Sequence, residues 1–225
     1  MNFNFKYFKI PDITLVTSKV FNDSRGFFGE VYKCSEFASA GITELFVQSN
    51  RSQSIQGVLR GLHYQLNPYA QGKLVRCVKG AIWDVGVDIR IDSSTYGQWI
   101  GINLNEVDNN ALYIPPGFAH GFYTITDIAE IQYSCTDEYS QEHDRGIIWN
   151  DPNINIKWPS NNPLLSDKDS KHPTLNDADN NFYLHEIKHS KSSFLIRYEN
   201  SYNRSERTVS TIFSELTVYF TTYIN

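Results

Sequence analysis

The feature that most constrains the fold is a series of short segments rich in Val, Ile, Tyr, Phe and Trp, separated by clusters of Gly, Asn, Asp and Pro. Segments of this length and composition are typical of strands in an all-β sandwich or barrel. KLVRCVKG alternates from Lys73, and AIWDVGVDIR follows it with Trp83, Val85 and Val87 on one face and Asp84 on the other. Long helical periodicity is missing, so the sequence predicts an all-β chain.

Three local signals interrupt the strand pattern. SEFASAG is the best helix candidate, with Ser35 as its N-cap and Gly41 as its stop. In LYIPPGFAHGFYTI, the rigid Pro-Pro-Gly turn presents His120 near the start of the following strand. From about Asp151 the chain becomes rich in Pro, Asn, Asp and Ser, which predicts a wrapping arm with one helical turn.

Composition excludes several classes of protein. With 225 residues, of which 40% are hydrophobic and 20% charged, the chain can bury a core and is not expected to be disordered. A net charge of -5 argues against a general nucleic-acid binder but leaves room for a local basic pocket. Neither a leader peptide nor a run of about 18 apolar residues is evident, so we expect no membrane segment. Three widely spaced cysteines without a CxxC pair favour a reducing compartment, the cytoplasm.

GVLRGLHYQ, residues 57–65, carries the first candidate catalytic side chain. Strand alternation places His63 on one face with Leu59 and Gly61, where a histidine is most often a satisfied core residue. Arg60 lies in the same apolar segment, and a buried guanidinium needs an anionic partner. Alternation puts Arg60 on the opposite face, so both side chains reach one cavity only if Gly61 bends or bulges the strand.

A group of cations extends this hypothesis. Arg25, Arg60 and Lys73 in one cavity would suit a phosphate or pyrophosphate, whereas separate positions would make them ordinary surface ion pairs. The spacing leaves both alternatives open. Neither GxxxxGK[ST] nor a strand-borne GxGxxG occurs, so ATP and dinucleotide chemistry are not favoured.

Metal chemistry is the main alternative for the histidines. His63 and His120 invite comparison with metal-binding barrels, but the residue two positions after His63 is Gln65, and one ligand per strand is too few for a site with three protein ligands. We therefore predict a metal-free site and keep a metal-dependent oxygenase as the alternative. The chain has no GxSxG motif, and none of its cysteines has a neighbouring histidine in sequence.

Two further side chains have both a functional and a structural interpretation. DIAEIQYSCTDEY alternates so that Tyr133 shares an apolar face with Ile131, and its hydroxyl must then find a partner. Tyr133 is either a proton donor or a core tyrosine bonded to a backbone carbonyl. Asp169 in the predicted arm is either a partner of a catalytic group or the cap of a turn.

These motifs occur together in one order: DSRGFFGE, GVLRGLHYQ, QGKLVRCVKGAIWDVGVDIR, PPGFAHGF, YSCTDEY, WNDPNINIKWP and LLSDKD. In that order they resemble the RmlC-type sugar-nucleotide epimerases, the dTDP-4-dehydrorhamnose 3,5-epimerase family. The resemblance implies a cupin-type jelly-roll β-barrel with short helices and a C-terminal arm. It covers residues 1–181, and residues 182–225 form an extension to which it assigns no role.

The resemblance also implies roles for individual residues. His63 would be the base, oriented by Asp169; Tyr133 would be the acid on the opposite side of the sugar, and Lys73 would stabilise the enolate. The implied substrate-binding residues are Arg25, Glu30, Gln48, Asn50, Arg60, His120, Tyr139, Asp144 and Lys168, with Arg60 on the pyrophosphate and Tyr139 stacked on the base. Asp144 departs from the family, which often has Glu there.

The implied reaction makes chemical sense without a cofactor or a metal. A 4-keto sugar acidifies the neighbouring C–H bonds, and inversion needs one group to remove a proton from one face and another to return a proton to the opposite face. The resemblance implies inversion at C3 and C5 in making dTDP-L-rhamnose for surface polysaccharide. Inversion at one carbon only, a GDP- or CDP-linked sugar or heptose, and a non-catalytic nucleotide-sugar-binding protein remain alternatives.

A homodimer is the last expectation. The resemblance implies that the N-terminal strand region exchanges or packs across two subunits. FNFKYF, residues 3–8, supports this because it is too apolar to be left in water.

Overall fold

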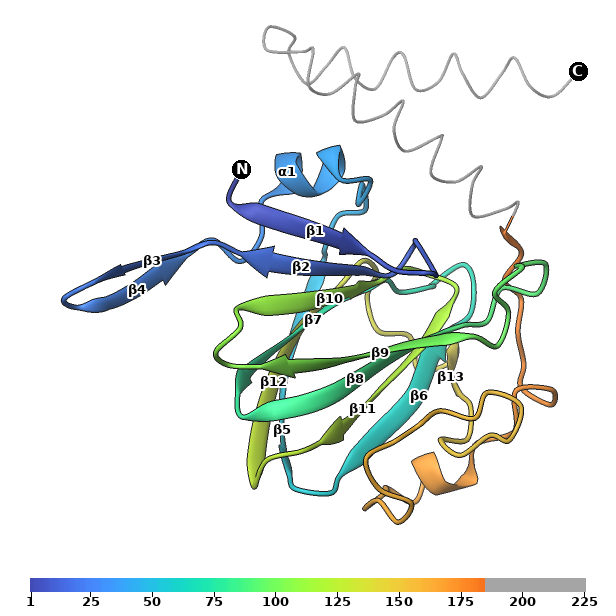
Figure 1. The fold of residues 1–225 in the computed structure, drawn as a ribbon. Helices are drawn as coiled ribbons and strands as arrows, with labels where there is room; N and C mark the ends of the chain where they lie inside the picture. The colour runs from blue at the N-terminus through green and yellow to red at the C-terminus, as the bar shows by residue number, and fades with distance from the viewer. Residues whose placement is uncertain (185–225) are drawn as a thin grey trace, which may run out of the picture. The chain divides into compact units, whose positions relative to one another are not determined.

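The computed structural model describes residues 1–184, and the fold described here is that of this part of the chain (Figure 1). Its elements in chain order are β1 (Phe3–Tyr7), β2 (Thr14–Ser18), β3 (Val20–Asp23), β4 (Gly26–Gly29), α1 (Cys34–Ser39), β5 (Gln48–Ile55), β6 (Leu59–Gln65), β7 (Lys73–Lys79), β8 (Ala81–Asp88), β9 (Trp99–Asn105), β10 (Asn110–Ile114), β11 (Phe118–Thr124), β12 (Ile128–Cys135), β13 (Asp144–Gly146) and the 3₁₀-helix η1 (Asp169–Lys171). The predicted extension from residue 182 lies almost entirely outside the described residues.

Two antiparallel sheets form the body of the fold. The larger has the order β1-β2-β10-β7-β12-β5 and the smaller has the order β13-β6-β11-β8-β9. The eight strands β5 to β12 are divided between the sheets in the order of a jelly roll, four in each sheet, while β1, β2 and β13 extend its edges. The predicted all-β jelly-roll class is therefore confirmed, although the two sheets stay separate and do not close into a barrel.

Buried residues of both sheets form the core between them, including Ile82, Leu104, Leu112 and Ile131. The outer face of the smaller sheet is covered as well, because Val85 and Val87 of β8 pack with residues of the C-terminal arm. Because both faces of the smaller sheet are covered, Val85 and Val87 of β8 are buried on one face. Asp84 is buried on the other face, in the interior. The arm beyond Asp151 follows the smaller sheet and contains the single helical turn η1, as predicted.

A bulge in β6 decides which side chains enter the interior. In the pairing of β6 with β11, His63 lies opposite His120 and Arg60 lies opposite Phe122, so β6 has one more residue in this interval than β11. Gly61 occupies the bulge with a φ of +137°, and a Cβ atom there would lie 2.5 Å from the Cα atom of Gly121. The expected bulge at Gly61 is confirmed, and it brings Arg60 and His63 to the same cavity.

The N-terminal region differs from the expectation in two ways. Phe3 and Phe5 of the apolar N-terminal segment pack within the chain, both edge-to-face against Phe37 of α1. Among the exposed large apolar side chains are those of Phe27 and Phe28, which are 69% and 65% exposed. They lie on the β3–β4 hairpin, which projects away from the two sheets (Figure 1). The argument from residues 3–8 was therefore wrong for Phe3 and Phe5, although Tyr7 of the same segment is 52% exposed, and the hairpin is a further apolar feature without cover.

The helix prediction was correct in position but not in its cap. Helix α1 begins at Cys34, its N-cap is Lys33, and no side chain caps it, so the predicted Ser35 cap is wrong. Gly41 follows the helix with a φ of +88°, which only a glycine adopts readily, and this agrees with the predicted stop. In the described residues, no helix is long and apolar enough to cross a membrane.

Candidate active site

A pocket of about 410 Å³ opens between the two sheets. The smaller sheet contributes Arg60 and His63 from β6 and His120 from β11. The larger sheet contributes Lys73 from β7 and Tyr133 from β12. The remaining predicted residues at its wall are Gln48, Asn50, Tyr139, Asp144 and Lys168. Ten of the thirteen residues predicted from the sequence therefore line one cavity, and the other three lie elsewhere.

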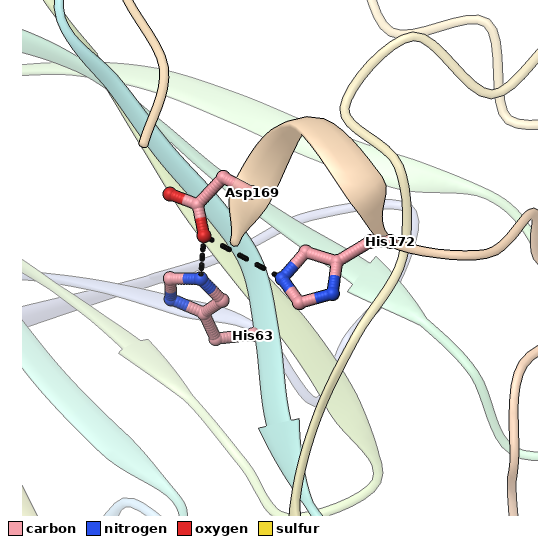
Figure 2. Close-up of side chains that lie close together, drawn as sticks. All are labelled: His63, Asp169 and His172. Atoms are coloured by element: carbon pink, nitrogen blue, oxygen red, sulfur yellow. Dashed lines mark hydrogen bonds and ion pairs between the residues drawn. The ribbon is translucent and has the colours of Figure 1, made fainter. Parts of the chain in front are cut away.

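Asp169 is one of the three, and it reaches the pocket through His63. Its Oδ1 atom lies 2.7 Å from Nε2 of His63 (Figure 2). Burial by itself raises the pKa of Asp169, but hydrogen bonds from His63 and from the backbone N–H of Gly61 outweigh it, so the pKa lies below the ordinary value. An ionised Asp169 accepts the Nε2 proton of His63, which leaves the Nδ1 lone pair free to act as a base.

His120 forms a second His–Asp pair on the same side of the pocket. Its Nε2 atom lies 2.7 Å from Oδ1 of Asp84, a residue of the neighbouring strand β8. The Asp84 side chain is completely buried, and the side chain of His120 is only 10% exposed. His120 is thus held rigidly, with its partner inside the smaller sheet.

Lys73 and Tyr133 face these histidines from the opposite sheet. Burial lowers the pKa of the Lys73 ammonium, against an opposing effect of the Cys135, Asp144 and Asp84 charges. Burial raises the pKa of the Tyr133 phenol, so the hydroxyl keeps its proton at neutral pH. The pocket consequently has a basic imidazole on one wall and a proton-donating phenol on the other, with an ammonium beside the phenol.

The mouth of the pocket is polar. Lys168 from the arm forms an ion pair with Asp144, and the Tyr139 hydroxyl donates to the same carboxylate at 3.1 Å. Arg60 is exposed and not buried as the sequence suggested, and its guanidinium donates to Ser54 Oγ and to the Gln53 carbonyl oxygen, both uncharged. Arg60 therefore has a full positive charge available to a bound anion.

Arg25 and Glu30 do not line this pocket. Both are on or beside the projecting β3–β4 hairpin, where Arg25 pairs with Asp23 and its side chain is 87% exposed. Glu30 accepts a hydrogen bond from Asn2 Nδ2 at 2.8 Å. The predicted cluster of Arg25, Arg60 and Lys73 is thus incomplete within one chain, since only the last two meet in the cavity.

The sequence interpretation missed His172 and the role of Asp84. His172 lies three residues after Asp169, and its ring packs edge-to-face against that of His63, with centroids 5.6 Å apart. Its Nε2 atom lies 3.5 Å from Asp169 Oδ1 (Figure 2). Recognising η1 as a 3₁₀ turn would have revealed it, because positions i and i+3 share a face there. Among the described residues, the group suited to a metal ion is His63, Asp169 and His172; His120 is not part of it.

Comparisons with known proteins place this architecture in a known group. Residues 7–177 match the family model of dTDP-4-dehydrorhamnose 3,5-epimerase. A protein of Shigella flexneri described as a dTDP-4-dehydrorhamnose 3,5-epimerase is 54% identical over 172 residues, which cover 76% of this chain and 95% of that protein.

Solved structures agree with this family match. The epimerase RmlC of Legionella pneumophila, in complex with dTDP-4-keto-L-rhamnose, superposes with a TM-score of 0.76 at 42% identity, covering 79% of this chain and 95% of that one. The RmlC epimerase of Mycobacterium tuberculosis gives a TM-score of 0.80 at 32% identity, covering 85% and 99% of the two chains.

Proposed function

The chain belongs to the dTDP-4-dehydrorhamnose 3,5-epimerase family, and from this premise we propose that it inverts C3 and C5 of dTDP-4-dehydro-6-deoxy-D-glucose to give dTDP-4-dehydro-L-rhamnose. The enzyme is thus an isomerase that acts on a nucleotide-linked sugar in the formation of dTDP-L-rhamnose. The observation that carries the proposal is the arrangement of the pocket, in which the His63–Asp169 pair and Tyr133 occupy opposite walls.

His63 is the proposed base. Because its Nε2 atom faces Asp169, the Nδ1 atom is the one that removes the proton from the carbon beside the ketone. Its side chain is 32% exposed, which gives a bound sugar access to the ring. Asp169 is the proposed orienting partner: it fixes the tautomer and stabilises the imidazolium that forms.

Lys73 and Tyr133 complete the proposed reaction from the other wall. Removing the proton moves negative charge onto the ketone oxygen, and the Lys73 ammonium stabilises that enolate. Tyr133 then donates its phenolic proton to the opposite face of the carbon, which inverts the configuration. Burial keeps this phenol protonated until the enolate forms. We further propose that Arg60 and Lys168 hold the diphosphate, that Tyr139 stacks on the base, and that Gln48, Asn50, His120 and Asp144 hold the rest of the substrate.

Solvent-deuterium incorporation tests this mechanism. The protein is incubated with dTDP-4-dehydro-6-deoxy-D-glucose in D₂O, and NMR follows C3 and C5. We expect deuterium at both carbons with inversion, and loss of both signals in His63→Ala. Tyr133→Phe should still exchange the proton, because His63 can remove and return it, but without inversion.

Tyr123→Phe is the matched control. It also removes a tyrosine hydroxyl, but Tyr123 is on the smaller sheet and does not line the pocket. Exchange at one carbon only would replace the proposal by a C3-only or C5-only epimerase. An unchanged rate of inversion in Tyr133→Phe would remove Tyr133 from the acid role. Absence of exchange in the unmodified protein would redirect the search to other nucleotide sugars or to a binding role.

We also propose that the active enzyme is a homodimer in which the β3–β4 hairpin of each subunit inserts into the other. Phe27 and Phe28 need cover that the described part of the chain does not give them. Arg25 is at the tip of the same hairpin and Glu30 follows it, so insertion would deliver both to a second copy. The three cysteines, all within the described residues, form no disulfide bond with one another, which suits the cytoplasm as the proposed compartment.

Subunit mixing tests the homodimer. Arg25→Ala and His63→Ala are prepared separately, and each is expected to have low activity. If Arg25 acts on the partner's substrate, heterodimers contain one intact site, so mixing the two variants should restore activity. Heterodimers seen by native mass spectrometry without recovery would place Arg25 outside the site or within its own subunit.

A further inference from the structure

We propose that His63, Asp169 and His172 form a binding site for a divalent transition-metal ion such as Zn²⁺, and that occupation of this site switches the enzyme off. The three residues offer two imidazole nitrogens and one carboxylate oxygen, and these donor atoms lie within 4.8 Å of one another. The site shares His63 and Asp169 with the proposed base, whereas His172 does not line the sugar pocket and has no part in the proposed reaction.

Local backbone geometry brings the three donors together. Asp169 begins η1 and His172 follows its end, so in a helix of three residues per turn the two side chains share one face. His63 reaches them from β6, and Gly146 of β13 is its partner in the register. A Cβ atom on Gly146 would lie 2.4 Å from the Nε2 and Cε1 atoms of His172. The absent side chain at Gly146 therefore makes the space that the His172 imidazole occupies.

The Nε2 atom of His172 is the second observation that points to a ligand. It is buried, and among the described residues it has no hydrogen-bond partner. The whole side chain is only 9% exposed, and its Nε2 atom is directed toward Asp169 Oδ1 at 3.5 Å (Figure 2). A buried ring nitrogen without a partner costs free energy, and a metal ion would supply the missing interaction.

The distances suit a transition metal after a small adjustment. Zinc binds imidazole nitrogen and carboxylate oxygen at roughly 2.0–2.2 Å, which puts neighbouring donors of a tetrahedral site roughly 3.3 Å apart. His172 Nε2 lies 3.5 Å from Asp169 Oδ1, and His63 Nε2 lies 2.7 Å from the same oxygen. The second distance must widen on binding, and the donor atoms of the two histidines already lie within 4.8 Å of each other. Two imidazoles and one carboxylate also leave a fourth position for water, as in open zinc sites.

Inhibition follows from the tautomer of His63, and this step rests on the proposed function. A metal ion on Nε2 displaces the proton that Asp169 now accepts, and a neutral metal-bound imidazole carries its proton on Nδ1. Nδ1 is the atom that must be unprotonated to remove a proton from the sugar. Metal binding therefore shifts the imidazole proton from Nε2 to Nδ1 with no net release of a proton. His63 can then no longer act as the base.

Binding is tested without any activity measurement. Full-length, metal-free protein is titrated with Co²⁺ while visible absorption is recorded, and with Zn²⁺ in equilibrium dialysis. We expect visible bands typical of a low-coordinate Co²⁺ site and one equivalent of bound Zn²⁺ that is lost in both His172→Ala and His172→Phe. His143→Ala is the matched control, since His143 bonds Ser140 outside this cluster. Equal metal binding by His172→Ala, His172→Phe and the unmodified protein would overturn the proposal.

Inhibition is then measured in the deuterium-exchange assay, with each variant normalised to its own rate without metal. We expect Zn²⁺ to inhibit the unmodified enzyme, a chelator to restore the rate, and His172→Ala to need at least about tenfold more Zn²⁺. If Zn²⁺ binds but does not inhibit, the proposed inhibitory switch is wrong and the proposed metal site stands. An enzyme without exchange activity that still binds one Zn²⁺ through His172 would refute the proposed function and leave the metal site intact.

Discussion

The two His–Asp pairs beside the pocket have the same bond and different surroundings. In each, Nε2 of the histidine lies 2.7 Å from a carboxylate oxygen, and His63 and His120 are direct neighbours in the register of β6 and β11. Asp84 belongs to the next strand of the same sheet, whereas Asp169 arrives from the C-terminal arm, 106 residues after His63. The side chain of His63 is 32% exposed and that of His120 only 10%.

Hydrogen-bond length therefore does not show which of the two histidines is the proposed base. Asp169 accepts hydrogen bonds from His63 and from the Gly61 backbone, so its charge is well compensated and serves to orient one ring. Asp84 is fully buried, and within residues 1–184 its Oδ2 atom has no hydrogen-bond partner. Burial lowers the pKa of Lys73, and the charge of Asp84 is one of three, after those of Cys135 and Asp144, that oppose this effect. The arm-built pair, His63–Asp169, contains the proposed base, and the sheet-built pair, His120–Asp84, contributes one of the charges that oppose the effect of burial on Lys73.

The largest expected difference between the two His–Asp pairs is in the kinetics of the variants in which each histidine is replaced by asparagine. His63→Asn should lower kcat by about 10²–10⁴-fold, because a general base contributes about that much. His120→Asn keeps a side-chain donor and should act mainly on KM. Steady-state kinetics with the deuterium-exchange assay measures both. A larger loss of kcat in His120→Asn than in His63→Asn would exchange the two assignments.

Gly61→Ala should damage the arm-built pair and leave the sheet-built pair in place. The added Cβ atom would overlap the Gly121 backbone, and alanine does not adopt a φ of +137° without strain. Overlap and strain together should lower the free energy of unfolding by roughly 2–5 kcal/mol. Urea unfolding measures the loss, and Gly26→Ala at the exposed hairpin, also at positive φ but with no atom within 4 Å, is the control for backbone strain alone. Equal losses in both variants would mean that overlap at the bulge contributes nothing.

Several of the structural features behind this comparison could be predicted from the sequence. The alternation in β8 and β12 predicted the strands. Because Arg60 and His63 were expected on opposite faces, a shared cavity required a bend or bulge at Gly61, and the register of β6 with β11 contains this bulge. The motif resemblance predicted the family, which the comparisons confirm. The roles of the individual site residues stay predictions.

What the sequence did not reveal depends on contacts between distant segments. Asp84 was assigned only to the polar face of a strand, since nothing local shows that the side chain of His120 on the neighbouring strand β11 reaches it. His172 was missed because a 3₁₀ turn of three residues leaves no periodic pattern. Phe27 and Phe28 were not recognised as exposed, and residues 3–8 were wrongly expected to need a partner, because packing on Phe37 is a tertiary contact.

Asp84→Asn should reduce stability more than Asp169→Asn. The charge-assisted hydrogen bond from His120 Nε2 would become a neutral one in a fully buried site, which costs about 1 kcal/mol. Asp169 lies in a short turn of the arm, which can relax more easily than the middle of a sheet. Urea midpoints at an unchanged m-value measure the difference. A larger loss in Asp169→Asn would show that the arm, and not the sheet, holds the rigid carboxylate.

The smallest expected effect is on the alkaline limb of the kcat profile. In the proposed mechanism Lys73 must be charged to stabilise the enolate, so activity falls as pH rises through the pKa of Lys73, which burial lowers and the charges of Cys135, Asp144 and Asp84 partly restore. Removing the Asp84 charge in Asp84→Asn lowers that pKa further, so the limb should move to lower pH. Lys73→Arg should move the limb to higher pH, because a guanidinium stays charged. If Asp169→Asn shifted the alkaline limb as far as Asp84→Asn does, the two carboxylates would affect the pKa of Lys73 equally. The proposed difference between the two His–Asp pairs would then be wrong.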